Sequence, residues 1–240
     1  PLPDSGPPPS STCTPPIKLV DTSKPDHVVG SGSAASCTAA KLAAAVAKGG
    51  VITFNCGAAT ATIKLDKAIS VPTKKQTVVD GGGKVVLDGQ AKDRIFHFNN
   101  PNYRKNSTKF VLQRLTLQNG RAKGTDYTPK DPKNPKCAYG YKDGAGGAVY
   151  VRDGVLHVID CVFKNNQAAS PGPDVGGGAV YALGSIAATF VGTQFINNQG
   201  SNGGAVGLLQ TTGTFVNCTF EGNKATGVGQ NYVLKGCKGV

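Results

Sequence analysis

One motif occurs three times between Gly146 and Asn223, and this repetition limits the possible folds more than any other feature of the chain. The copies read GGAVYVRDGVLHVIDCVFKNN (146–166), GGAVYALGSIAATFVGTQFINN (177–198) and GGAVGLLQTTGTFVNCTFEGN (203–223). Periods of about 20–50 residues are typical of stacked architectures, in which each unit buries its apolar face against its neighbours. Apolar and polar residues alternate within each copy, which indicates strands rather than helices. The sequence therefore predicts an all-β fold of stacked repeats.

The aligned copies predict which side chains lie above one another. One column contains Phe163, Phe195 and Phe220, and apolar columns of this kind are expected to face the interior, with layers about 4.8 Å apart. The other columns are Val158, Phe190 and Phe215; Cys161, Thr193 and Cys218; and Asn166, Asn198 and Asn223. An asparagine column can bind a ligand or form a turn ladder, in which left-handed residues are joined by amide hydrogen bonds. We favour the turn ladder.

Shorter segments of the same kind precede the repeats. They span residues 51–56, 61–65, 68–71, 78–89, 93–98 and 111–120, and in the last of them Leu112, Leu115 and Leu117 are expected to face inward. The segment CTAAKLAAAVAKGG (37–50) predicts a helix at about residues 37–48, which would cover the open end of the stacked strands. Residues 1–35 are rich in proline and serine, so we expect an extended arm or linker there and a single domain over 36–240.

These motifs resemble a known group of proteins. The pattern C-T-x-x-x-L-x-x-A (37–45), V-I-T-F (51–54), strands separated by D-G-G-G and the repeated G-G-A-V-Y…C-x-F-x-x-N are similar to secreted bacterial right-handed parallel β-helix proteins. That group includes pectin-lyase-like repeat proteins, and polymorphic outer-membrane adhesins carry similar Gly-Gly-Ala and Phe-x-x-Asn repeats. The resemblance covers about residues 36–225 and implies a right-handed parallel β-helix with a short N-terminal capping helix. It implies no single activity, because this scaffold carries lyases, hydrolases, adhesins and structural modules.

The cysteines point to an oxidising compartment. Seven cysteines occur in a chain without methionine, which suggests a processed, secreted product. Cys37 opens the predicted helix and Cys56 closes the next strand, so we predict a disulfide between them. Cys161 and Cys218 share a column two layers apart, about 9–10 Å, which is too far for a disulfide, and they are interpreted as buried thiols. The pairing of the remaining three stays open: Cys13, Cys137 and Cys237.

Positive charge is concentrated in one region of a chain whose formal net charge is +12. Between Asn102 and Lys142, ten basic residues are opposed only by Asp126 and Asp131. Much of this region is an inserted loop at about residues 121–145, and loops on rigid scaffolds often carry binding residues. We expect either a solvated loop or a site for a polyanion such as an acidic polysaccharide, an anionic cell surface or nucleic acid. The candidate polyanion-binding residues are Arg104, Lys105, Lys109, Arg121, Lys123, Lys130, Lys133, Lys136 and Lys142.

Catalytic residues are hard to find in this sequence. Uronate lyases on this scaffold need clustered carboxylates that hold Ca²⁺ and a basic side chain, and glycosidases need two carboxylates. The aspartates that precede glycine are explained as turn residues: Asp80, Asp88, Asp143 and Asp153. We therefore predict no catalytic site, with Asp88, Asp93 and Arg94 as weak candidates only.

No metal site is predicted either. The three histidines, His27, His97 and His157, are scattered, and the last two are expected to be outward surface residues of strands. No cofactor is predicted, and Ca²⁺ would be expected only if the chain were a lyase.

The sequence thus favours a secreted, extracellular or cell-surface structural module of the adhesin type. No segment resembles a membrane span. After Asn223 no second capping helix is evident, so exposed strand edges are expected to promote self-association into oligomers or filaments. The alternative is that the chain is a fragment and that further layers of the whole protein cover this end. The alternative is a polysaccharide lyase or hydrolase that acts on acidic, uronate-containing glycans.

Overall fold

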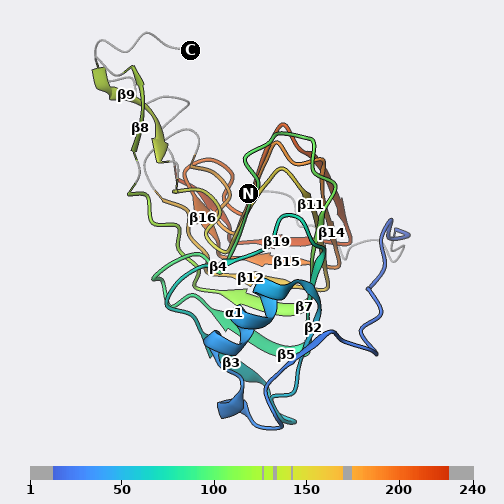
Figure 1. The fold of residues 1–240 in the computed structure, drawn as a ribbon. Helices are drawn as coiled ribbons and strands as arrows, with labels where there is room; N and C mark the ends of the chain where they lie inside the picture. The colour runs from blue at the N-terminus through green and yellow to red at the C-terminus, as the bar shows by residue number, and fades with distance from the viewer. Residues whose placement is uncertain (1–12, 126, 132–133, 142, 170–174, 227–240) are drawn as a thin grey trace, which may run out of the picture.

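The computed structural model describes residues 13–125, 127–131, 134–141, 143–169 and 175–226; for 127–131 and 134–141 it describes the backbone. The chain is mostly β-structure, arranged in parallel sheets, as the sequence predicted. Figure 1 shows the strands stacked in layers, with the N-terminal helix at one end. Among the described residues, no helix has the length and apolar character needed to cross a membrane.

Two sheets contain most of the strands, and all their pairings are parallel. The eleven-stranded sheet has the order β1 (His27–Val29), β2 (Gly50–Phe54), β5 (Thr77–Asp88), β7 (Lys109–Gln118), β11 (Val155–Ile159), β14 (Ala187–Val191) and β18 (Thr212–Val216). Its remaining strands are β3 (Ala61–Lys64), β12 (Val162–Lys164), β15 (Gln194–Ile196) and β19 (Thr219–Glu221). The five-stranded sheet has the order β17 (Val206–Leu209), β13 (Val180–Leu183), β10 (Val149–Arg152), β6 (Phe96–Asn99) and β4 (Ile69–Ser70). A short pair joins β16 (Gln199–Gly200) to β20 (Lys224–Ala225).

The three sequence repeats form three successive layers. Each repeat places one strand in the five-stranded sheet and two in the eleven-stranded sheet, and equivalent strands are direct neighbours. Phe163 pairs with Phe195 and Phe195 with Phe220, and their rings stack at centroid distances of 5.2 and 4.8 Å. The column of Val158, Phe190 and Phe215 has the predicted register as well. The register of the predicted columns is therefore confirmed, and their members in the first two repeats are buried, as are Leu112, Leu115 and Leu117.

The asparagine ladder is confirmed, but its left-handed residues lie one position earlier than expected. Positive φ angles occur at Asn165 (55°), Asn197 (52°) and Gly222 (62°). This bend turns the next side chain inward, so that Asn166 and Asn198 are fully buried. The Asn198 Oδ1 atom accepts from the Asn166 backbone N (2.9 Å), and Asn223 Oδ1 accepts from Asn198 N (2.9 Å). The amides thus satisfy backbone groups that the turn would otherwise leave unpaired.

Helix α1 (Ala39–Lys48) forms where the sequence predicts a helix. The Thr38 side chain caps it by accepting from Lys41 N at 3.3 Å, and the helix ends at Gly49, whose φ is +64°. Its buried face contains Leu42, Ala45 and Val46. A disulfide joins Cys37 to Cys56, the predicted pair. Of the other described cysteines, Cys13, Cys161 and Cys218 are free thiols.

The described part of the predicted arm, residues 13–35, contains regular structure. Strand β1 lies within the predicted arm (1–35) and pairs with β2, and its Val29 is buried. The composition obscured this strand because it is only three residues long. Residues before β1 are attached through side-chain hydrogen bonds and not through strand pairing. The Gln113 amide bonds to the backbone N–H and C=O groups of Val20, and the Asn217 amide bonds to those of Cys13. The described part of the arm, residues 13–35, is therefore joined to the sheet.

The inserted loop contains regular structure. Strands β8 (Tyr127–Asp131) and β9 (Asn134–Tyr141) pair antiparallel as a hairpin. In Figure 1 this hairpin projects away from the stacked strands.

Candidate functional site

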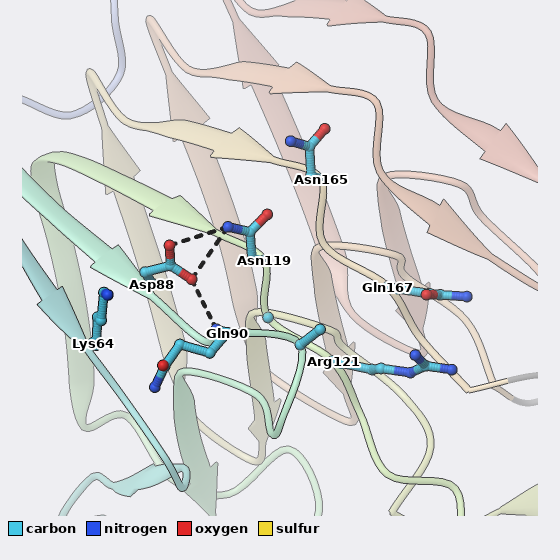
Figure 2. A pocket seen from close by; sticks show the side chains of 9 residues that line it. Lys64, Asp88, Gln90, Asn119, Arg121, Asn165 and Gln167 are labelled. Atoms are coloured by element: carbon cyan, nitrogen blue, oxygen red, sulfur yellow. Dashed lines mark hydrogen bonds between the residues drawn. The ribbon is translucent and has the colours of Figure 1, made fainter.

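A polar pocket of about 450 Å³ lies where four layers of the large sheet turn. Its lining comes from the end of β3, the residues after β5, the residues after β7 and the residues after β12 (Figure 2). The lining residues are Lys64, Asp88, Gln90, Ala91, Asn119, Gly120, Arg121, Asn165 and Gln167. The pocket is therefore a property of the stack, since no single layer contains it.

Backbone conformation at the turns explains why polar side chains gather there. Asn119 and Asn165 have φ angles of 52° and 55°, a left-handed conformation that asparagine tolerates better than most residues. Gly120 lies between the layers, where a Cβ atom would collide with the carbonyl oxygen of Gly147. Arg121 and Gln167 then form a parallel bridge, which places them in adjacent layers at the same position.

Asp88 is the one carboxylate among the described residues that line the pocket, and both its oxygen atoms accept hydrogen bonds. Its Oδ1 atom accepts from Gln90 N at 2.7 Å, and its Oδ2 atom accepts from the amides of Gln118 (2.9 Å) and Asn119 (3.1 Å). Burial disfavours its charged form, but these hydrogen bonds and the charge of Lys64 outweigh burial and lower the pKa of Asp88. Asp88 is thus an ionised, weakly basic group at neutral pH.

The remaining lining is suited to hydrogen bonding rather than to acid–base chemistry. Amides of Asn and Gln both donate and accept, and Lys64 and Arg121 donate as cations. The described residues contain no group of three or more His, Cys, Asp or Glu that could hold a metal ion. A lone carboxylate with a lowered pKa lacks the partner that a glycosidase requires. This arrangement can bind a hydroxyl-rich or anionic molecule.

The other two weak catalytic candidates lie outside the pocket. Asp93 accepts from the backbone of Ala68 (3.2 Å) and forms an ion pair with Lys123 (3.2 Å). Arg94 is buried, donates to the carbonyl oxygens of Asp143 and Ala145, and lies 5.3 Å over the ring of Tyr150. Desolvation lowers the pKa of Arg94. These contacts give both residues structural roles.

The candidate polyanion-binding residues lie both before and after β7 in the chain. Arg104, Lys105 and Lys109 precede or begin that strand, whereas Arg121 and Lys123 follow it. Of these five described residues, Arg121 lines the pocket. Lys130 and Lys136 lie on the hairpin, where only the backbone is described, and Lys133 and Lys142 lie outside the described residues.

Two expectations about polar residues need correction. Asp80 is more than a turn residue: it is buried, forms an ion pair with Arg114, and accepts hydrogen bonds from Gln113 (3.0 Å) and from Thr22 (2.7 Å) of the arm. His97 lies in a strand but is half-buried against Tyr150, at a ring-centroid distance of 5.2 Å. Burial, together with the charge of Arg94, lowers the pKa of His97 to about 4, so it is neutral at physiological pH.

Sequence reasoning overlooked most of the pocket residues. The signal was present, because N-G-R (119–121), N-N-Q (165–167) and N-N-Q (197–199) recur at the same turn. The inward asparagine of this triplet was recognised, while its outward neighbours were not.

Comparison with known protein families matches part of the repeated region. The model of the Chlamydia polymorphic membrane protein repeat matches residues 160–183, which span β12 and β13. No curated protein and no solved structure matches the chain significantly. The match lies within the repeated region, and it supports similarity to a bacterial repeat protein.

Proposed function

We propose that this chain is a module of a secreted or cell-surface bacterial protein of the adhesin type, built as a right-handed parallel β-helix. The match of residues 160–183 to the Chlamydia polymorphic membrane protein repeat carries the proposal. The parallel layers and the disulfide between Cys37 and Cys56 support it, since disulfides persist in oxidising extracellular compartments. The module would present turns and loops on a rigid stack, where binding residues are commonly found.

Labelling of intact cells tests this location. Antibodies against the purified chain should stain unpermeabilised cells of the source bacterium, and added protease should remove the signal. A cytoplasmic protein should remain unstained in the same cells. Staining that requires permeabilisation would contradict the proposal.

Binding of acidic polymers is the second part of the proposed function. The uneven distribution of basic residues supports it, because clustered cations attract polyanions in a salt-dependent manner. Changing Lys130, Lys133 and Lys136 to Glu should reduce retention on a polyuronate or heparin-like resin. The matched control changes Lys48, Lys74 and Lys84 to Glu, which alters the net charge equally at exposed positions elsewhere. Equal losses in both variants would indicate an effect of overall charge only.

Self-association is the third part. In the last described layer, Phe215 and Phe220 are 40% and 51% exposed, although their counterparts Phe190 and Phe195 are fully buried. The outer edges of β18 and β19 have no further partner among the described strands. Such edges and apolar rings favour stacking of a second copy, and repetition of that contact would give filaments. Light scattering of the purified chain that shows only monomers at all concentrations would contradict this part.

A further inference from the structure

We infer that the pocket at the turn of the large sheet binds a sugar acid, a saccharide unit that carries a carboxylate. The inference deepens the proposed function, since it names the ligand class of a site on the proposed adhesin-like module. It is carried by the charge balance of the pocket and by the unused hydrogen-bonding groups in its lining.

Among the described residues, one cation of the pocket has no ion-pair partner. Lys64 is the register neighbour of Asp88, and its charge acts on that carboxylate. Arg121 forms none of the ion pairs among the described residues, which join Lys92 to Asp66, Arg114 to Asp80 and Lys123 to Asp93. In Figure 2 Lys64 and Arg121 stand on either side of Asp88 and Gln90. The Arg121 guanidinium is therefore the preferred position for an added carboxylate, which it can bind through two parallel hydrogen bonds.

The groups beside Arg121 favour a sugar over a bare anion. The side-chain amides of Asn165 and Gln167 line the same pocket, and neither makes a side-chain hydrogen bond to another described residue. Each offers donors and an acceptor, the combination that a sugar hydroxyl needs. Asn165 is exposed and Gln167 is half-buried, so both are accessible to a ligand.

The side chains that line the pocket disfavour other classes of ligand. Among the described residues, its lining contains no aromatic ring, and Ala91 is its one apolar side chain. A nucleobase or an apolar molecule would therefore gain little, because such ligands need aromatic or aliphatic contacts. Asp88 repels any anion, and a sugar acid offsets this repulsion through hydrogen bonds between its hydroxyls and the lining amides, so inorganic phosphate is expected to bind more weakly than a sugar acid. The volume of about 450 Å³ lies within the range of small-molecule sites.

Matched ligands test the role of the carboxylate. The probes are D-galacturonate, its methyl ester, N-acetylneuraminate, D-galactose and inorganic phosphate, measured by ligand-observed NMR and calorimetry on the whole chain. A sugar acid should bind with a Kd on the order of 1 mM, as expected for a small ligand in an open site. The methyl ester and galactose should bind at least about tenfold more weakly, since they lack the charged contact. Preference for galacturonate or for N-acetylneuraminate then distinguishes the two kinds of sugar acid.

Matched variants test the position of the site. Arg121→Gln should weaken binding about tenfold, whereas Lys84→Gln, the loss of an exposed cation outside the pocket, should leave it unchanged. Asp88→Asn removes the like charge and should strengthen binding, a gain that misfolding cannot produce. Thermal melts of all three variants verify that they fold.

Several results would overturn the inference. These are equal binding of galacturonate and its methyl ester, equal binding of phosphate, equal losses in Arg121→Gln and Lys84→Gln, or no binding of any sugar acid. Surface staining is measured separately, so loss of the sugar-acid site would leave the proposed location of the module standing. Conversely, sugar-acid binding without surface staining would support the site and contradict the proposed surface location.

Discussion

Asn198→Asp tests the hydrogen-bonded ladder at its centre. The Asn198 amide accepts from the backbone N and Nδ2 of Asn166, and it donates to Phe163 O (3.0 Å) and to Asn223 Oδ1 (2.9 Å). The substitution replaces the donating NH₂ with an oxygen that faces two other oxygens. An ionised carboxyl group there is buried and unpaired, so we expect a loss of about 3–5 kcal/mol in the free energy of unfolding at pH 7.

The pH dependence identifies the cause of that loss. Burial and the facing oxygens raise the pKa of the introduced carboxyl group in the folded state above its unfolded value of about 3.9. The variant then loses stability relative to the parent as pH rises above about 4, and below pH 4 the difference shrinks to the cost of the lost hydrogen bonds, about 1–3 kcal/mol.

Thermal melts of parent and variant between pH 3.5 and 8 measure this difference. At pH 7 the melting temperature should fall by about 10 °C, given roughly 2–4 °C per kcal/mol for a chain of this size. The control is Asn197→Asp, one residue earlier, where the side chain is exposed and φ is 52°, and it should change the free energy by no more than about 0.5 kcal/mol. Equal effects of the two substitutions, or a loss that does not depend on pH, would refute the assignment of Asn198 to a buried ladder.

Three further predictions follow from packing, thiol burial and the arm. Phe195→Ala should lower the free energy of unfolding by about 3–5 kcal/mol, because it opens a cavity between Phe163 and Phe220. His157→Ala, at a half-buried outward position, should lower it much less. Denaturant unfolding that shows the reverse order would contradict the register. Iodoacetamide at pH 8 should modify Cys13 but not Cys161, because burial raises the pKa of the Cys161 thiol to about 12. Mass spectrometry that finds modified Cys161 in the folded protein would disprove the burial of this thiol. Gln113→Ala should free the arm at Val20 and accelerate tryptic cleavage after Lys18, whereas Gln194→Ala, at an exposed position on β15, should not. Equal cleavage rates would show that Gln113 does not hold the arm.

The repeated part of the fold could be predicted from sequence because its layers are related by register. Once Phe163, Phe195 and Phe220 were aligned, the neighbouring columns followed, since in-register strands place equivalent residues side by side. The pairing of Cys37 with Cys56 was predictable for a local reason, as the two cysteines flank one helix and one strand.

The arm could not be predicted in the same way. Its attachment depends on Gln113 and Asn217, which lie 93 and 204 residues from Val20 and Cys13. Side-chain amides that bind a distant backbone leave no periodic pattern in the sequence. Only the fold brings them together.

The pocket shows why a candidate site can be overlooked even when its repeat is recognised. An asparagine that points inward and one that points outward have the same identity, and the left-handed bend between them decides which is which. Placing that bend at Asn166 rather than Asn165 gives no orientation for Asn165 and Gln167, so their contribution to a pocket is not evident. With the bend at Asn165, the same triplet supplies one buried ladder residue and two accessible ligand-binding groups, Asn165 and Gln167. A shift of one residue in a turn therefore separates a purely structural column from a surface that can recognise a saccharide.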